Sequence, residues 1–236
     1  KTQQLAEDQL EVIPGIELDT NYDENNLHIL GYYFDRNSDQ IDKLLAGLEE
    51  AKQKQFIGRI KALQELGFNI TAEEVRRKAD VERPLGGFIA KVLLSKAENR
   101  SDDRLQTYLT GAKSDQPYFN FYLDYFRPGG KAYVSCWKPD SKAAIRTIRD
   151  LGGVAVLAHP GSTLEVDDRG VIADLKQAGL QGLEVYSTYH DSQEIEGFKR
   201  LAEEYNLLMT AGSDFHGELK PKIELGGVEE NKYQIV

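Results

Sequence analysis

The chain has 236 residues, of which 40% are apolar, and its formal net charge is −10. This length and apolar content allow one large domain, or one domain that carries an insertion. The acidic balance argues against a protein that holds long DNA along a basic face, although a local group of Arg and Lys can still bind a phosphate. We therefore expect the protein to bind a nucleic-acid substrate locally, close to the catalytic residues.

Cysteine use and the lack of long apolar runs narrow the class of protein further. Cys136 is the only cysteine, which excludes an internal disulfide framework and a cysteine-based zinc cluster. A cytoplasmic location is the default expectation. No apolar run approaches the roughly 20 residues that cross a bilayer, and the first residues show no signal-peptide pattern. Because the chain opens with Lys1 and its one methionine is Met209, we expect that Lys1 is not the natural start.

Two strands are predicted near the start of the chain, over residues 10–18 and 27–34. A Pro-Gly pair interrupts the first strand, and a polar turn separates it from the second. Glu17 lies in the first strand and His28 in the second. Adjacent strands would bring both side chains to one rim of a sheet.

A helical region follows these strands. Apolar residues recur at three- and four-residue steps from residue 38 to residue 67, which predicts a long amphipathic helix. Thr71 is expected to cap the next helix, with Glu74 completing a capping box. Shorter helical patterns and several breakers continue beyond them, so residues 37–130 are predicted to form a helical insertion.

Helices and strands alternate after the insertion. This alternation, with continuous apolar strands, predicts an α/β fold with parallel strands covered by helices. Such folds build active sites at the carboxyl ends of their strands. The expected elements are a helix over 140–151, a strand over 154–158, a helix near 171–179, a strand over 183–186, a helix over 192–205, a strand over 207–211 and a further strand within 223–236.

Carboxylates and histidines lie at several of these strand ends. The set combines carboxylate oxygen with imidazole nitrogen and contains no sulfur, which suits Zn²⁺, Mn²⁺ or Fe²⁺. Such ions lower the pKa of a bound water toward ~7 and neutralise charge on a phosphoryl group. The candidate ligands are Glu17, His28, His159, Asp214 and His216.

Each candidate also has an ordinary structural explanation. Glu17 alone fits an edge carboxylate, and His28 alone fits a half-buried histidine bonded to backbone. The Asp214-x-His216 pair is flanked by glycines, which let the backbone approach a ligand. Together, the five positions favour a metal cluster over five separate structural roles.

Five short motifs together carry a family resemblance. They are Pro-Gly-Ile-Glu at 14–17, His-Ile-Leu-Gly-Tyr at 28–32, Ala-His-Pro at 158–160, Gly-Leu-Glu-Val-Tyr at 182–186 and Gly-Ser-Asp-Phe-His-Gly at 212–217. This set resembles the PHP (polymerase and histidinol phosphatase) superfamily. Within it the chain is most similar to the branch with a helical insertion, which includes nucleoside bisphosphate phosphatases and TrpH-like 5′ to 3′ exoribonucleases. The resemblance implies a distorted (β/α)7 barrel, with residues 1–36 and 131–236 as its parts and 37–130 as the insertion.

The resemblance also implies roles for the candidate ligands around two or three divalent ions. Glu17 would bridge two ions, and His28 and His159 would complete one site. Asp214 would complete another, and His216 would serve a third.

The chain departs from the family at its front. Members open with Asp-Leu-His-x-His-Thr and soon add Asp-His, and neither motif occurs in this sequence. Two readings compete: the opening strands precede Lys1 in a longer protein, or this variant lacks them and holds fewer ions. We expect the first, because a parallel barrel without those strands would expose long apolar edges.

Three further residues are candidates for substrate binding. Arg83 opens a helix of the insertion and could reach a phosphate, or it could pair with a nearby acid. His190 follows a strand and could donate to the substrate or protonate a leaving oxygen; otherwise it is an exposed residue at the start of a helix. Lys220 is a plausible phosphate contact or part of a solvated turn.

An aromatic cluster in the insertion has two explanations. The rings could stack on a nucleobase, or they could form the core of the insertion. The residues are Tyr118, Phe119, Phe121, Tyr122, Tyr125 and Phe126.

The sequence therefore predicts a metal-dependent phosphoesterase in which a metal-bridging hydroxide attacks phosphorus. Asp214, His216 and His190 are the expected catalytic residues, and the insertion would select a terminal phosphate on a nucleotide or short RNA end. A histidinol-phosphate-like phosphatase is one alternative, and a catalytically silent metal-binding module is another. No membrane and no long DNA are expected as partners, while the oligomeric state stays open.

Overall fold

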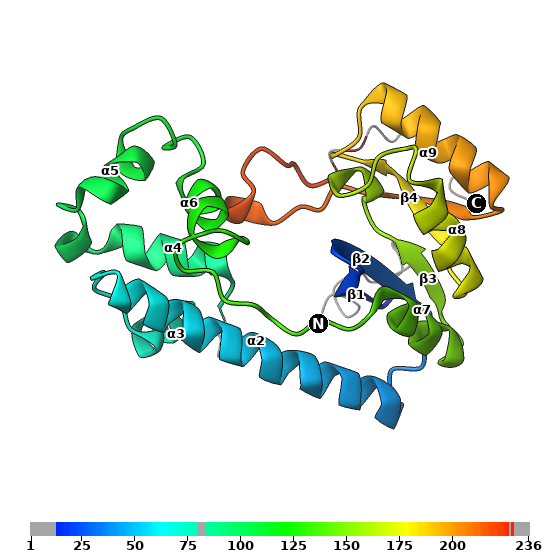
Figure 1. The fold of residues 1–236 in the computed structure, drawn as a ribbon, viewed down its shortest axis with the longest axis horizontal. Coiled ribbons are helices and arrows are strands. Elements are labelled where there is room, and N and C mark those ends of the chain that lie inside the picture. Colours follow the sequence, from blue (N-terminus) through cyan, green and yellow to red (C-terminus); the bar gives the residue numbers. More distant parts are fainter. Residues whose placement is uncertain (1–12, 80–83, 227, 229–236) are drawn as a thin grey trace, which may run out of the picture. The chain divides into compact units, whose positions relative to one another are not determined.

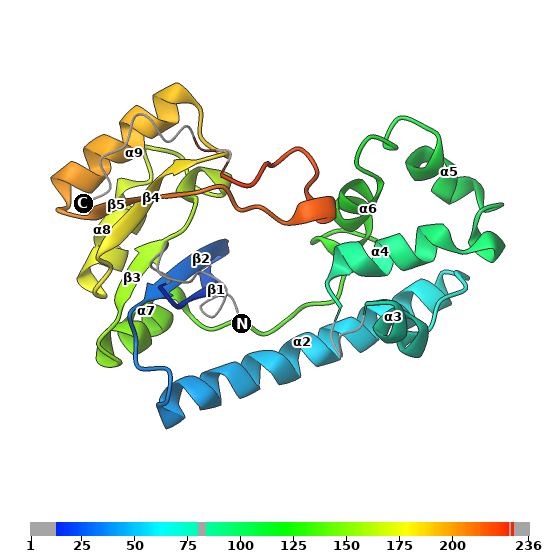
Figure 2. The same cartoon turned by 180° about the vertical axis from the view of Figure 1, so that it is seen from behind.

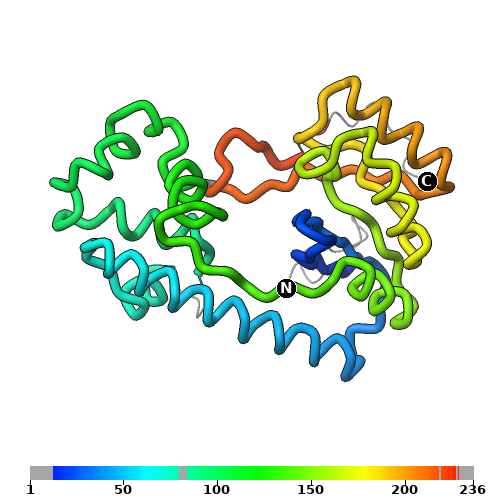
Figure 3. The backbone as a smooth tube through the Cα atoms, in the orientation of Figure 1, coloured from blue at the N-terminus to red at the C-terminus, as the bar shows by residue number. Residues whose placement is uncertain are grey.

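The computed structural model describes residues 13–79, 84–226 and 228. They form two compact units, each with its own core (Figures 1 and 2). The sheet unit contains the described residues up to Leu44 together with residues 138–214, and the helical unit contains residues 45–137 and 215–224. Figure 3 shows how the chain runs from one unit into the other and back.

The sheet unit is built on five strands in the order β1-β2-β3-β4-β5. The first three strands pair antiparallel, whereas β3, β4 and β5 pair parallel, as the alternating pattern after the insertion predicts. The strands are β1 (Gly15–Tyr22), β2 (Asn25–Tyr32), β3 (Val154–Leu157), β4 (Gly182–Ser187) and β5 (Leu208–Gly212).

The α/β class is confirmed, but the described residues form an open five-stranded sheet and not the predicted (β/α)7 barrel. The reason lies in the connections. A tight turn joins β1 to β2, with Asp23 at φ +50°, and so short a turn allows only antiparallel pairing. Helices α8 and α9 cross between the parallel strands β3, β4 and β5. Strands β2 and β3 pair antiparallel although helices also lie between them in the chain. Of the further strand expected within 223–236, residues 223–226 and 228 form none, and the rest lies outside the described residues.

Three helices belong to the sheet unit: α7 (Ser141–Asp150), α8 (Arg169–Gln177) and α9 (Ser192–Glu204). Helix α7 packs on β1, β2 and β3, and α9 packs on β4 and β5. Their inward residues include the fully buried Ile145 and Phe198. Each of these two helices begins at an aspartate that accepts backbone N–H groups, Asp140 for α7 and Asp191, in a full capping box, for α9.

The helical unit consists mainly of α2 (Asp39–Glu65), α3 (Ala72–Ala79), α4 (Gly86–Ser95), α5 (Asp103–Leu109) and α6 (Pro117–Phe126). The predicted long helix is thus confirmed as α2. Thr71 caps α3 by accepting the N–H of Glu74 at 3.2 Å, and the Glu74 carboxylate accepts from Lys96 at 2.6 Å. Among the described residues, no helix has both the length and the apolar character that crossing a bilayer requires.

Half of the predicted aromatic cluster forms the core of the helical unit. Phe121, Tyr125 and Phe126 are each at most 4% exposed, and the rings of Phe121 and Tyr125 stack with their centroids 4.1 Å apart. Stacked and edge-on rings of this kind add to the free energy of burial. These three side chains are therefore core, whereas Tyr118 and Phe119 stay partly accessible.

Replacing the cap of α7 tests how this helix is held on the sheet. Asp140→Ala removes the acceptor of the Ala143 N–H, at 2.8 Å in the structure. We expect the free energy of unfolding to fall by about 1 kcal/mol, measured by urea denaturation. Asp150→Ala is the control: Asp150 is exposed at the other end of α7, where a carboxylate opposes the helix dipole, so its loss should be neutral or slightly stabilising. Equal destabilisation by both variants would contradict the capping role.

Candidate metal centre

The β1–β2 hairpin places Glu17 and His28 on one face of the sheet. In the observed register Asp19 pairs with His28 and Glu17 pairs with Leu30. Side chains two residues apart in a strand share a face, so Glu17 and His28 are diagonal neighbours. Glu17 Oε1 lies 2.6 Å from His28 Nδ1. The predicted convergence of these two residues is confirmed.

His159 joins them from the end of β3. Its backbone is held at φ +27° and ψ 59°, an unusual conformation for a non-glycine residue that the surroundings must stabilise. The imidazole Nε2 lies 3.4 Å from Glu17 Oε1, and Nδ1 lies 2.9 Å from the hydroxyl of Ser162. The strained turn thus directs the ring toward the hairpin.

Glu17, His28 and His159 form one compact cluster. One ligand atom from each of the three lies within 4.8 Å of the others, and the two imidazole rings meet edge to face with centroids 4.9 Å apart. One carboxylate and two imidazoles form a donor set that Zn²⁺, Mn²⁺ and Fe²⁺ accept. The structure brings together three of the five predicted ligands in one possible metal site.

Hydrogen bonds between the carboxylate and the imidazoles shift the pKa values of Glu17 and His159. Hydrogen bonds from His159 and His28 hold the pKa of Glu17 well below its usual range. Burial lowers the pKa of His159, but the hydrogen bond to Glu17 and the charges of Glu184 and Asp214 outweigh burial and raise it. Metal ions bind the neutral imidazole and release its proton. A divalent ion that binds the cluster would therefore take the place of the proton on the His159 ring and pair with the Glu17 carboxylate.

A buried carboxylate, Glu184, supports the cluster and was missed among the site residues predicted from the sequence. Its Oε2 accepts the backbone N–H of His159 at 2.8 Å. The residue is 5% exposed, and burial raises its pKa. A Cβ on Gly212 would lie only 2.1 Å from Glu184 Oε1, so the glycine makes room for the carboxylate. The signal in the sequence was a glutamate within a short, mainly apolar predicted strand, a position where carboxylates are rare.

Asp214 follows β5, two residues beyond Gly212, the last residue of that strand. Its Oδ2 accepts a 2.6 Å hydrogen bond from the hydroxyl of Tyr189, whose ring centroid is 5.4 Å from that of His159. The charge of Asp214 acts on His159 and on Glu184. Like His159, Asp214 has a positive φ, +53°. Unusual backbone conformations that follow two strands of one sheet, β3 and β5, are typical of functional sites.

Asp19 is a further carboxylate of this face that sequence reasoning did not select. Its Oδ1 lies 3.6 Å from His28 Nε2 and 2.8 Å from the Lys138 ammonium. The two-residue spacing from Glu17 was the available signal. Asp19 therefore contacts the opposite side of the His28 ring from Glu17.

Both ring nitrogens of His190 are engaged inside the fold. Nδ1 lies 2.8 Å from the carbonyl of Val185, and Nε2 accepts the N–H of Gly161 at 2.9 Å. Burial lowers the pKa of His190, so the neutral ring with its proton on Nδ1 fits both partners. In this state the ring ties β4 to the turn after His159. A contact with substrate stays a prediction, and it requires one of these bonds to open.

The remaining predicted site residues lie elsewhere in the chain. His216 is exposed and precedes the short turn η4 (Gly217–Leu219), and Lys220 follows that turn. Both belong to the helical unit. Arg83 lies outside the described residues. The roles of these three residues stay predictions.

Several curated proteins match the chain, although no protein-family model does. A phosphoribosyl 1,2-cyclic phosphate 1,2-diphosphodiesterase of Eggerthella lenta is 28% identical over 89% of this chain and 74% of its own length. A 5′-3′ exoribonuclease of Haemophilus influenzae is 28% identical over 88% of this chain and 70% of its own length. A 3′,5′-nucleoside bisphosphate phosphatase of Chromobacterium violaceum is 26% identical over 92% and 71%. All three names denote phosphoester hydrolases, so the predicted kinship is confirmed.

Two solved structures share the fold. A protein of Bifidobacterium adolescentis described as a metal-dependent phosphoesterase has a TM-score of 0.76 at 23% identity, over 96% of this chain and 75% of that chain. A Chromobacterium violaceum protein described as an amidohydrolase has a TM-score of 0.70 at 24% identity, over 86% and 67%. The arrangement of strands and helices is therefore that of known α/β proteins.

Crowding Glu184 tests the support of the cluster. Gly212→Ala should weaken binding of Mn²⁺ or Zn²⁺ by about 10- to 100-fold, because the new Cβ would displace the carboxylate that holds the His159 backbone. Isothermal titration calorimetry measures the affinity. Gly170→Ala is the matched control, since a Cβ at Gly170 meets nothing within 4 Å. Wild-type affinity in Gly212→Ala would show that Glu184 does not position the cluster.

Proposed function

We propose that this relative of the PHP phosphoesterases is a metal-dependent hydrolase of phosphate esters, with its metal site at Glu17, His28 and His159. The observation that carries the proposal is the convergence of one carboxylate and two imidazoles within 4.8 Å at one edge of the sheet. The phosphoester hydrolases among its relatives support the reaction class.

Three residues of the site would bind the ions, and Glu184 orients one of those three. Glu17 stays ionised and presents a carboxylate that can bridge two ions. His28 and His159 bind as neutral rings, and Glu184 fixes the backbone of His159. Bound divalent ions would supply Lewis-acid activation of water and neutralise charge on the phosphoryl group.

We extend the site to two or three ions, as the resemblance implies. Asp214 is the proposed ligand of a second ion, and the effect of its charge on His159 and Glu184 supports this role. His216, the second residue after it, is the proposed ligand of a third. Nitrogen and oxygen donors without sulfur favour Mn²⁺, Zn²⁺ or Fe²⁺. The cytoplasm stays the location predicted from the sequence.

The proposed substrate is a nucleotide or a short RNA end. The names of the three relatives have in common a phosphate ester carried on a ribose. The net charge of −10 favours a small or terminal substrate over a long polyanion. We therefore place nucleoside 3′,5′-bisphosphates and 5′-phosphorylated RNA ahead of histidinol phosphate.

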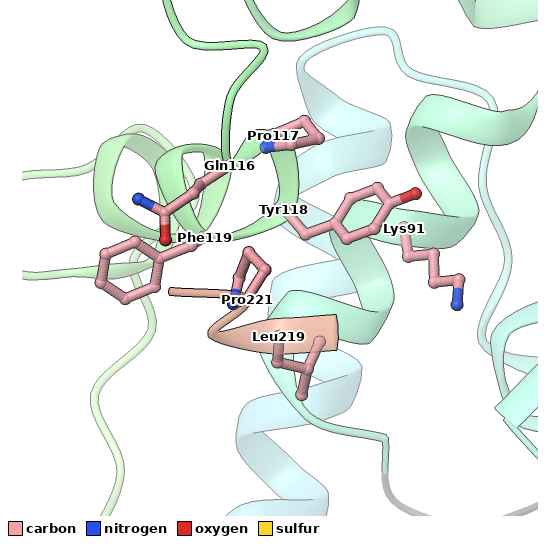
Figure 4. A pocket seen from close by; sticks show the side chains of 7 residues that line it. All are labelled: Lys91, Gln116, Pro117, Tyr118, Phe119, Leu219 and Pro221. Atoms are coloured by element: carbon pink, nitrogen blue, oxygen red, sulfur yellow. The ribbon is translucent and has the colours of Figure 1, made fainter. Parts of the chain in front are cut away.

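A hollow in the helical unit provides aromatic surface for a base. Its volume is about 480 Å³, and Figure 4 shows the side chains around it. Tyr118 and Phe119 belong to it, and Lys91 from α4 adds a cation to its lining. Aromatic faces hold bases of any sequence by stacking. We propose that Tyr118 or Phe119 stacks on the nucleobase. The lining residues are Lys91, Gln116, Pro117, Tyr118, Phe119, Leu219 and Pro221.

Metal dependence is the first test of the reaction. With Mn²⁺, the wild-type protein should release phosphate from a nucleoside 3′,5′-bisphosphate or from 5′-phosphorylated RNA, and a chelator should abolish the release. Glu17→Gln should lower the rate by at least about 100-fold through loss of the bridging charge. Glu24→Gln, an exposed carboxylate in the turn of the same hairpin, should leave it unchanged.

The outcome of this assay separates the alternatives. Release from histidinol phosphate alone would move the substrate to that class. If metal binds and no substrate in the panel releases phosphate, the protein is a silent metal-binding module and the enzymatic proposal is wrong.

The aromatic hollow makes a separate prediction. Phe119→Ala together with Tyr118→Ala should raise KM for a nucleotide about 10-fold or more, because stacking contributes about 1–3 kcal/mol per base. KM for p-nitrophenyl phosphate, whose leaving group is not a base, should change little. Trp137→Ala, which removes an aromatic ring that is 56% exposed, is the control. An equal loss for both substrates would argue against base recognition.

A further inference from the structure

Arg59 is a buried cation of the helical unit. The residue lies in α2, is 9% exposed, and its Nε has no hydrogen-bond partner. Its Nη2 lies 3.5 Å from the carbonyl oxygen of Phe126, at the outer limit of a hydrogen bond. A guanidinium carries five N–H donors in a rigid fork. The Nε donor is therefore buried without an acceptor among the described residues, while the Tyr122 side chain also acts on the guanidinium.

The neighbours of Arg59 are neutral. The guanidinium carbon lies 4.9 Å from the ring centroid of Phe126 and 5.8 Å from that of Tyr122. Cation–π contacts offset only part of the cost of burying a charge. Within the described part of the chain no carboxylate compensates Arg59, and burial lowers its pKa. Arg104, which also lies over an aromatic ring, has Asp102 as its counter-charge.

The first turn of α4 meets this guanidinium. A Cβ on Gly86 would lie 3.1 Å from Arg59 Nη1 and 2.8 Å from the ring of Tyr122, so the glycine permits the close approach. Leu85 provides no side-chain cap, and the first turn of α4 contains no acidic residue. The first N–H groups of a helix lack intrahelical acceptors and carry a partial positive charge. Two positive groups thus lie close together, and none of the carboxylates among the described residues compensates them.

We propose that Arg59 and the N-terminus of α4 form a binding site for a phosphate group. Helix N-termini bind phosphate through backbone N–H groups, and the guanidinium fork binds two phosphate oxygens at once. Both elements of the site belong to the helical unit. The phosphate is either free inorganic phosphate or part of a phosphorylated nucleotide. The site contains no metal ligand, so phosphate binding can be tested independently of the proposed hydrolysis.

Inorganic phosphate is the first probe, titrated into the full chain after removal of metal ions by a chelator. Isothermal titration calorimetry should show saturable binding, and phosphate should raise the melting temperature by mass action. Arg59→Met should weaken the binding by at least about 10-fold, and Arg59→Lys should lie between the two because it keeps the charge and loses the fork. Arg77→Met removes an exposed arginine of α3 and should bind as the wild type does.

The stability of Arg59→Met without phosphate gives a second readout. Replacing an uncompensated buried charge by an apolar side chain of similar length should leave the melting temperature unchanged or raise it. The variant should also lose the rise that phosphate causes in the wild type. If Arg59→Met does not fold, the phosphate titrations of the wild type and of Arg59→Lys still show whether Arg59 binds phosphate.

Competition identifies the source of the phosphate. If a nucleoside 3′,5′-bisphosphate displaces inorganic phosphate from the wild type and binds Arg59→Met at least about 10-fold more weakly, the group belongs to a nucleotide. If it does not displace inorganic phosphate, the ligand is free phosphate. The proposal is overturned if the wild type shows no saturable binding of phosphate, or if Arg59→Met binds phosphate as tightly as the wild type.

Discussion

The hydrogen bond from the backbone N–H of His159 to the buried carboxylate of Glu184 is the interaction on which the candidate metal centre depends. It connects the end of β3 to the middle of β4 and holds His159 in a conformation that the residue would not adopt alone. Gly212 of β5 makes room for the same carboxylate. Three parallel strands therefore cooperate to direct one imidazole toward the hairpin that carries Glu17 and His28. Burying a carboxylate costs free energy unless it is hydrogen-bonded. The bond to the His159 N–H reduces this cost and fixes the position of both groups.

Charge explains why this edge of the sheet suits divalent cations. Glu17, Asp19, Glu184 and Asp214 bring four carboxylates around two imidazoles. In the structure, hydrogen bonds with His28 and His159 offset the charge of Glu17, and Lys138 offsets that of Asp19. A divalent ion would replace the protons and neutralise the remaining excess. His190, with both ring nitrogens engaged, keeps the turn after His159 attached to β4 and leaves the charge of the cluster unchanged.

The helical unit presents the opposite electrostatic situation. Its core is aromatic, with Phe121 and Tyr125 stacked at its centre, and its buried Arg59 has no carboxylate partner among the described residues. A carboxylate-rich edge in one unit attracts cations, whereas a guanidinium and a helix N-terminus in the other attract anions. The aromatic hollow of the same helical unit, at Tyr118 and Phe119, offers surface for stacking.

The sequence by itself determined the long helix α2, the parallel strands after the insertion and the convergence of Glu17 with His28, because hydrophobic periodicity and a short turn are local properties. It also identified the kinship with phosphoesterases, since the motifs around His159 and Asp214 are contiguous. Only the tertiary structure showed that the described residues form an open five-stranded sheet, because strand pairing joins segments far apart in the chain. The support of His159 by Glu184, the engaged ring of His190 and the uncompensated charge of Arg59 are likewise tertiary, because burial and hydrogen-bond partners are set by neighbours that are distant in sequence.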